Sequence, residues 1–178
     1  MKKPKVISSN IVYRGFFDVH QDMVEKKDGA LHPYSSLVLQ LDATAILAQD
    51  EEGRWILNRE YRHPTKEFLL GCPGGRLEPG EDPIAGGRRE FFEETGYWSN
   101  EIIQIGCCHP FPGLCNQKIY YLWAKNAYKK GEQQLDEFEV IFTELKTDAE
   151  LKDELKNATR VDATLLAALY YKSLATGF

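Results

Sequence analysis

Short runs of β-branched and aromatic residues, separated by polar turns, occupy most of the chain. Runs of this kind predict β-strands. Turn-like sequences at 27–29 and 50–53 and a loop at 63–66 separate several of them. We expect strands over 11–24, with a break at Gly15, and over 36–48, 55–61, 102–107, 119–124 and 138–142.

One helix is marked by signals at both of its ends. Asp82 followed by Pro83 is a strong helix start, because Asp accepts hydrogen bonds from the free amides and proline suits the first helical position. Gly96 is a typical stop. Ile84 and Phe91 fall on the same helical face, so they define a stripe that we expect to face the core.

Helical patterns return near the C-terminal end of the chain. A charged segment over 148–157 predicts one helix, and Asp162 begins a second whose apolar residues fall at helical spacing: Leu165, Leu166, Leu169 and Tyr170. Strands before and after one central helix, followed by terminal helices, predict an α/β sandwich with a mixed sheet.

Three carboxylates share the face of the central helix that lies opposite its apolar stripe. Glu90, Glu93 and Glu94 fall within an arc of roughly 100° and would repel one another by a few tenths of a kcal/mol per pair. We therefore expect a cation there, and oxygen ligands suit a hard ion such as Mg²⁺ or Mn²⁺. An ordinary solvated acidic face, with Arg89 and Glu93 as a surface ion pair, is the alternative.

The approach to this helix is unusually rich in glycine and proline. Its residues include Pro73, Gly74, Gly75, Pro79 and Gly80, and Gly86 and Gly87 follow inside the helix. Each helical glycine costs about 1 kcal/mol relative to alanine. A solvated acidic face does not explain such a tightly turned entry, whereas a metal site that handles phosphate does.

The whole segment resembles the signature box of the Nudix hydrolases. It reads GRLEPGEDPIAGGRREFFEETGY from Gly75 to Tyr97, and the family's fixed positions are filled by Gly75, Glu81, Arg89, Glu90, Glu93, Glu94 and Gly96. Aromatic Phe91 and Tyr97 stand where aliphatic residues are commoner. The resemblance implies an α/β/α sandwich and metal-dependent hydrolysis of diphosphate-containing substrates.

A second, less specific resemblance covers much of the remaining chain. Four further segments are similar to ADP-ribose pyrophosphatases and related nucleoside-diphosphate-sugar hydrolases. They are the runs 57–64 and 68–75, the loop Phe111-Pro112-Gly113, and an acidic loop that enters a strand at 136–138. That subfamily implies a homodimer that exchanges N-terminal strands. Gly71 and Gln117 stand where acidic residues are common, which favours a broader nucleoside-diphosphate-sugar hydrolase that accepts ADP-ribose.

The resemblance also implies roles for individual residues. Two or more Mg²⁺ ions, with Mn²⁺ as a substitute, would be held by the carbonyl of Gly74 and by Glu81, Glu90, Glu93 and Glu94. A bound water would attack phosphorus. A general base would come from the loop after the box, where we predict Glu137 ahead of Glu132 and Asp136. The predicted catalytic set is Arg89, which anchors the acidic face by ion pairing, with Glu93 and Glu137.

Substrate contacts are predicted from two further regions. Arg59 and Arg62 precede the box and would offer guanidinium forks to phosphate oxygens. Their alternative is an ion pair with Glu60 or Glu67. In the N-terminal region Phe16, with Tyr13 and Phe17, would stack on a nucleobase, and the alternative is that these aromatic residues belong to a core.

Length and charge narrow the remaining choices. The 178 residues fit one domain, with an N-terminal strand region at about 1–40 and a catalytic core at about 41–178. A net charge of −5 argues against a general nucleic-acid binder. No run has signal-peptide or membrane-span character, so we expect no membrane partner and a cytoplasmic location.

Three alternatives stay open at this point. A zinc site built from Cys107, Cys108, His109 and Cys115 would need an unusual geometry, and we expect reduced thiols instead. A Nudix enzyme that cleaves nucleoside triphosphates, dinucleoside polyphosphates or capped RNA would carry the same box. A nucleotide-sensing module without catalysis is the non-enzymatic possibility.

Overall fold

The structure is a computed structural model that describes residues 3–157 and 160–177. The chain divides into two compact units, Met1–Asp42 with His109–Lys118, and Ala43–Cys108 with Ile119–Phe178. The sequence placed the first boundary at about residue 40. It did not indicate that the segment 109–118, which we expected only to link two strands, groups with the N-terminal residues.

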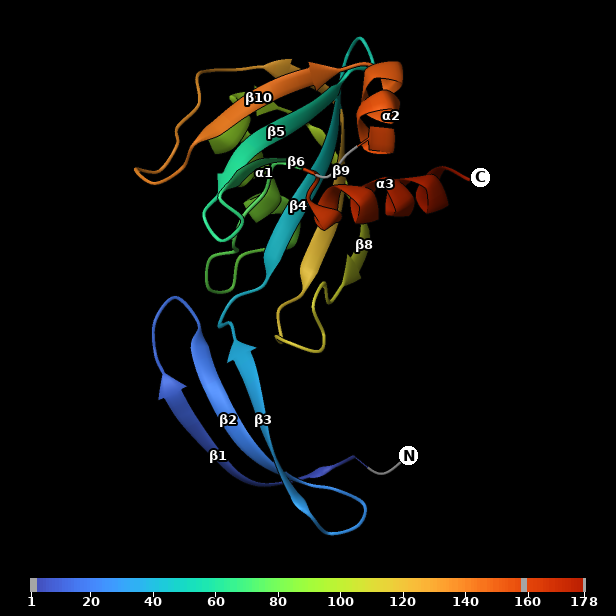
Figure 1. Ribbon diagram of the computed structural model, residues 1–178. Helices are drawn as coiled ribbons and strands as arrows, with labels where there is room; N and C mark the ends of the chain where they lie inside the picture. Colours follow the sequence, from blue (N-terminus) through green and yellow to red (C-terminus); the bar gives the residue numbers. More distant parts are fainter. Residues whose placement is uncertain (1–2, 158–159, 178) are drawn as a thin grey trace. The chain divides into compact units, whose positions relative to one another are not determined.

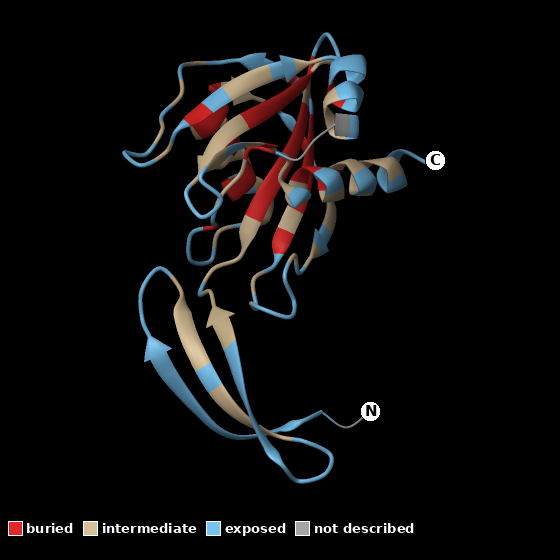
Figure 2. Cartoon of the chain, in the orientation of Figure 1, coloured by how far each residue is buried: buried red, intermediate tan, exposed pale blue. Residues whose placement is uncertain are grey.

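The first unit is a three-stranded antiparallel sheet. Its strands β1 (Lys5–Tyr13), β2 (Asp18–Glu25) and β3 (Leu31–Val38) are ordered β1-β2-β3. β1 is exposed along its whole length (Figure 2). The segment 109–118 joins this unit at the end of β3, where the Leu37 amide donates to the Leu114 carbonyl at 2.8 Å.

The second unit is built on a mixed sheet. Its strands are β4 (Ala43–Asp50), β5 (Trp55–Arg62), β6 (Glu67–Gly71), β7 (Tyr97–Trp98), β8 (Glu101–Cys108), β9 (Ile119–Lys129) and β10 (Ile141–Lys146). The order is β10-β5-β4-β9-β7, with β6 beside β5 and β8 beside β9. β4 and β9 run parallel, whereas the other strand pairs in this sheet are antiparallel.

Helices cover both faces of this sheet (Figure 1). Side chains of β4 alternate between two hydrophobic clusters, because successive strand residues point to opposite faces. Ile46 packs with Phe91 of α1 (Pro83–Thr95), while Leu47 packs with residues of α2 (Asp148–Asn157) and α3 (Ala163–Thr176). The predicted α/β/α sandwich with a mixed sheet is confirmed.

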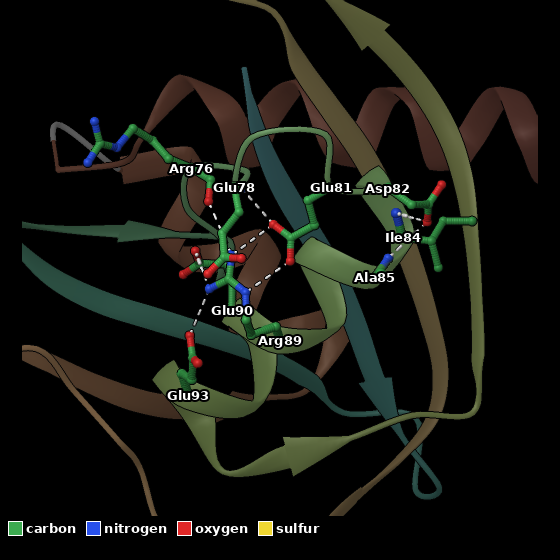
Figure 3. Close-up of polar contacts among 9 residues, drawn as sticks. All are labelled: Arg76, Glu78, Glu81, Asp82, Ile84, Ala85, Arg89, Glu90 and Glu93. Atoms are coloured by element: carbon green, nitrogen blue, oxygen red, sulfur yellow. Dashed lines mark hydrogen bonds and ion pairs between the residues drawn. The ribbon is translucent and has the colours of Figure 1, made fainter. Parts of the chain in front are cut away.

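The predicted ends of the central helix are also confirmed. The Asp82 carboxylate accepts hydrogen bonds from the amides of Ile84 and Ala85, each at 3.0 Å (Figure 3). Gly96 closes the helix at a φ of 69°, with its amide on the Phe92 carbonyl. A side chain at Gly96 would begin 2.2 Å from the Gly131 carbonyl oxygen, so this position requires glycine for both conformation and space.

Several strand predictions need correction. The strand predicted over 138–142 begins instead at Ile141, and Phe138 is 92% exposed. The apolar–polar–apolar pattern there reads as a strand, but the Glu139 amide closes a turn onto the Asp136 carbonyl. The segment 36–48 is not one strand, because β3 ends at Val38 and β4 begins at Ala43. β6 and β7 were not predicted.

The described residues include no helix that is both long and apolar enough to cross a membrane.

Candidate active site

The loop that enters the central helix is attached to the backbone of β4. The Pro73 carbonyl accepts from the Ile46 amide at 2.8 Å, and the Gly75 carbonyl accepts from the Thr44 amide at 2.9 Å. Between them Gly74 has a φ of 145°, and a Cβ there would lie 2.3 Å from the Thr44 carbonyl oxygen. Only glycine allows this approach, which directs the Gly74 amide towards α1.

That amide binds the carboxylate of Glu94. Glu94 is 4% exposed, and its Oε2 accepts from Gly74 N at 2.7 Å and from Asn58 Nδ2 at 3.0 Å. Burial raises the pKa of Glu94 well above its usual range; the Gly74 hydrogen bond lowers it, and nearby carboxylates raise it further. Both hydrogen-bond donors are neutral, so neither compensates the charge of the ionised group.

Arg89 holds together two acids of α1 and one acid of the loop that enters it (Figure 3). Its Nε and Nη2 each donate to Glu81 at 3.0 Å in a bidentate fork. Its Nη1 donates to Glu90 at 2.9 Å and to Glu93 at 3.0 Å. The hydrogen bond from Arg89 lowers the pKa of Glu81. The ion pairs expected of Arg89 with the acidic face are therefore present.

The donors of this acidic site fit a divalent metal ion in their chemistry. In the described part of the chain no group of three His, Cys, Asp or Glu side chains is already arranged to hold a metal ion. At the acidic site, the guanidinium of Arg89 lies among Glu81, Glu90 and Glu93. Burial nevertheless raises the pKa of Glu90, even though Arg89 opposes the shift. Half-buried and buried carboxylates without full charge compensation suit a hard cation.

The loop between β9 and β10 is attached to the end of α1. The Gly131 amide donates to the Gly96 carbonyl at 3.1 Å, and the Gln134 amide donates to the Glu93 carbonyl at 2.7 Å. The Gln133 side chain donates to the Glu94 carbonyl at 2.5 Å. These bonds satisfy carbonyls that a helix end leaves without partners, and they bring the acidic loop to α1.

One acid of this loop that the sequence reasoning missed lies near the site. The charge of Glu139 contributes to the raised pKa of Glu60, Glu90 and Glu94. Glu139 is half-buried, whereas Glu137 is exposed. An acid between two apolar residues just before a strand was the available signal. Glu137 stays our sequence-based prediction of the base, and Glu139 becomes a second candidate.

Arg59 belongs to an ion-pair network that joins β5, β10 and α2. It contacts Glu144 at 2.6 Å and Glu154 at 2.5 Å, and Lys146 contacts the same two acids at 2.9 and 2.7 Å. The Arg59 hydrogen bond lowers the pKa of Glu144. Burial acts to raise the pKa of Glu154, but the bonds from Lys146 and Arg59 outweigh it, and the pKa is lowered.

The structure does not bring Arg59 together with the acidic site. Asn58, its neighbour on β5, binds Glu94, and adjacent strand residues point to opposite faces. The alternative was an ion pair with Glu60 or Glu67, and Arg59 pairs instead with Glu144 and Glu154. We therefore leave Arg59 out of the proposed substrate contacts.

The other two predicted substrate residues have different surroundings. Arg62 pairs with Glu60 at 2.6 Å, which is the ion pair given above as the alternative to a substrate contact, and its side chain is 43% exposed. Phe16 is 65% exposed in the first unit, where Phe17 contacts both Phe16 and Tyr13 with ring centroids 6.5 and 6.2 Å apart. Both substrate contacts stay predictions. The four cysteines are free thiols.

Comparison with known proteins decides the family. The model of the NUDIX domain matches residues 39–169, which is most of the chain. The chain belongs to the Nudix family. The segment from Gly75 to Tyr97, which contains α1 and the acids arranged around Arg89, is therefore the Nudix box that the sequence resembled.

Matches between this Nudix protein and individual relatives cover most of both chains. It is 29% identical over 154 residues to an ADP-ribose pyrophosphatase of Bacillus subtilis, covering 85% of this chain and 81% of the relative. It is 28% identical over 178 residues to a methanol dehydrogenase activator of Bacillus methanolicus, covering 98% and 91%. A crystal structure of an ADP compounds hydrolase matches with a TM-score of 0.87 at 23% identity, over 99% of this chain and 97% of that one. That likeness shows the shared fold.

Proposed function

We propose that this Nudix protein hydrolyses the diphosphate bond of nucleoside diphosphate sugars, ADP-ribose among them, to a nucleoside monophosphate and a sugar phosphate. The observation that carries the proposal is the buried Glu94 carboxylate, whose hydrogen-bond donors among the described residues are neutral and which lies beside the acids that Arg89 gathers. The names of two matched proteins, an ADP-ribose pyrophosphatase and an ADP compounds hydrolase, favour this substrate class.

We further propose that the acidic site works with two or more Mg²⁺ ions, for which Mn²⁺ can substitute. Glu90, Glu93 and Glu94 would hold them, with Glu81 and the Gly74 carbonyl. When bound, such ions neutralise charge on the diphosphate and lower the pKa of a water molecule that attacks phosphorus.

The chain's own groups then have separate roles. Arg89 keeps Glu81, Glu90 and Glu93 in place, so that their carboxylates do not have to be ordered when substrate arrives. Arg62 offers a guanidinium fork to a phosphate oxygen. A carboxylate of the loop after β9 takes the proton of the attacking water, and the bridging oxygen leaves with the other phosphate.

Product analysis with a substrate panel tests the proposal. The panel holds ADP-ribose, ADP-glucose, GDP-mannose, UDP-glucose, NADH, diadenosine polyphosphate and dGTP, with Mg²⁺, and with EDTA as the blank. We expect cleavage of the diphosphate sugars to a nucleoside monophosphate and a sugar phosphate. Cleavage of only dGTP or the polyphosphate would contradict the substrate class. Binding of ADP-ribose without any cleavage would favour a nucleotide-sensing module.

We also propose a cytoplasmic homodimer that exchanges its N-terminal strands. In support, β1 is an edge strand that exposes apolar side chains, including Val6 at 54%, Val12 at 58% and Tyr13 at 56%. Edges of this kind readily pair with another chain. Sedimentation velocity should give about twice the 20.4 kDa chain mass, and deletion of residues 1–13 should give the monomer. A 20.4 kDa species at every wild-type concentration would contradict the dimer.

A further inference from the structure

Asn58 is a polar residue in the middle of a buried strand. It follows Trp55, Ile56 and Leu57 on β5 and is only 1% exposed. Its Nδ2 donates to Glu94 at 3.0 Å, while its Oδ1 has no hydrogen-bond partner among the described residues. A buried acceptor without a partner destabilises a fold, so an apolar residue would suit this position better if stability alone were concerned.

The hydrogen bond from the Asn58 side chain has a defined effect on Glu94. Asn58 Nδ2 and the Gly74 amide, from β5 and from the loop entering α1, both donate to the same atom, Oε2. Two donors that converge on one oxygen from separate elements fix the rotation of the carboxylate. Oε1 is then the oxygen that is available to a cation.

The backbone of Glu94 is held from the same side of the sheet. Thr143 of β10 lies directly opposite Asn58 in the strand register, and its hydroxyl donates to the Glu94 carbonyl at 3.4 Å. Gln133 donates to that carbonyl as well. Both the side chain and the main chain of Glu94 are therefore held by groups that reach it from outside α1.

We propose that Asn58 is a positioning residue that orients the Glu94 carboxylate for a divalent metal ion. The inference rests on the proposed function, because it assigns Glu94 to the metal site. The same geometry explains why Oδ1 lacks a partner. When Nδ2 faces Glu94, Oδ1 faces away from it and stays buried. Hydrogen bonds to a metal ligand set its orientation, and their loss lowers metal affinity by about 10- to 100-fold.

The test measures Mn²⁺ binding by the electron paramagnetic resonance signal of free Mn²⁺, without substrate. Asn58→Leu is nearly isosteric and removes both the donor and the unpartnered acceptor. Asn58→Val, whose β-branched side chain suits a strand, is the second variant in case leucine packs poorly. We expect the Kd for Mn²⁺ to rise about 10-fold or more in each. The melting temperature of the metal-free protein should stay level or rise.

Ser99→Ala is the matched control. Ser99 is also fully buried, but its hydroxyl donates to the Lys125 carbonyl and accepts from the Glu101 amide, both outside the acidic site. This variant should lower the melting temperature, because it removes these hydrogen bonds of the Ser99 hydroxyl. The Kd for Mn²⁺ should stay within about twofold of wild type, because the lost bonds do not involve the acidic site. Stability and metal affinity would thus change independently in the two sets of variants.

Two outcomes would overturn the inference. An unchanged Kd in folded Asn58→Leu and Asn58→Val would show that Glu94 needs no help from Asn58. A lower melting temperature with an unchanged Kd would make Asn58 a purely structural residue. Hydrolysis of ADP-ribose by the wild type, measured in the same buffer, separates this result from the proposed function. If the wild type cleaves ADP-ribose and the variants keep the wild-type Kd for Mn²⁺, only the role of Asn58 is contradicted. If the wild type neither binds Mn²⁺ nor cleaves ADP-ribose, both the role of Asn58 and the proposed function are contradicted.

Discussion

Glu94→Gln is expected to lower kcat for ADP-ribose by about 10³-fold or more while making the metal-free protein more stable. Glutamine keeps the shape of the side chain, and its carbonyl oxygen can still accept from Gly74 and Asn58. It lacks the negative charge that a divalent ion requires, so the charge stabilisation of the transition state is lost. Folding also no longer buries an unpaired charge, which should raise the free energy of unfolding by roughly 1–3 kcal/mol at pH 7.

The opposite signs of these two effects make the prediction specific. Activity is measured as AMP release with saturating Mg²⁺, and stability is measured by urea unfolding in EDTA. Glu101→Gln is the control, because Glu101 is an exposed acid bonded to Asn126 on β9, and both quantities should stay near wild type. A Glu94→Gln enzyme that keeps a tenth of the wild-type kcat would show that Glu94 is not a metal ligand.

Glu139→Gln is expected to lower kcat by about 10²- to 10⁴-fold, the range for loss of a general base. Glu139 is the half-buried acid of the loop, and its charge reaches Glu90 and Glu94. The loop carrying it is fixed to α1 through Gln133 and Gln134, so the fold itself should survive the change. Stability and Mn²⁺ affinity should therefore stay close to wild type while kcat falls.

Glu137→Gln decides between the two candidate bases. Both variants remove one carboxylate from the same loop, and the residues differ in burial and in their influence on the acidic site. Steady-state kcat and KM are measured for each with ADP-ribose. A large loss in Glu137→Gln together with near wild-type Glu139→Gln would support the sequence-based prediction and contradict the choice made from the structure.

The parts of the fold that could be predicted from sequence are those set by local interactions. The start of α1 depends on Asp82 and Pro83, and its end depends on Gly96, all within or next to the helix. The strand predicted over 138–142 failed because its true position is set by pairing of Ile141 with Glu60, on a strand far away in sequence. β6 was missed for a similar reason, since it exists through pairing with β5.

In the site, too, contacts between neighbouring residues could be predicted from the sequence, whereas contacts between distant segments could not. Arg89, Glu90 and Glu93 lie within about one turn of α1, so their contacts follow from helical spacing, and Glu81 lies in the loop just before the helix. Asn58 is separated from Glu94 by 36 residues, and the Gln133 side chain reaches Glu94 across 39. Strand pairing and loop placement bring such residues together, and neither can be derived from a local pattern. Arg59 shows the converse, since a promising local motif turned out to bind acids on another face.

Hydrolysis of ADP-ribose in ¹⁸O-labelled water shows whether this Nudix protein cleaves a diphosphate bond through the acidic site of α1. The products of the wild-type protein with Mg²⁺ are analysed by mass spectrometry, with Glu94→Gln treated in parallel. We expect AMP and ribose 5-phosphate, with one ¹⁸O atom in the phosphate of one product and no reaction in the variant. Intact ADP-ribose, or equal cleavage by Glu94→Gln, would contradict a diphosphate hydrolase that works through the acidic site of α1.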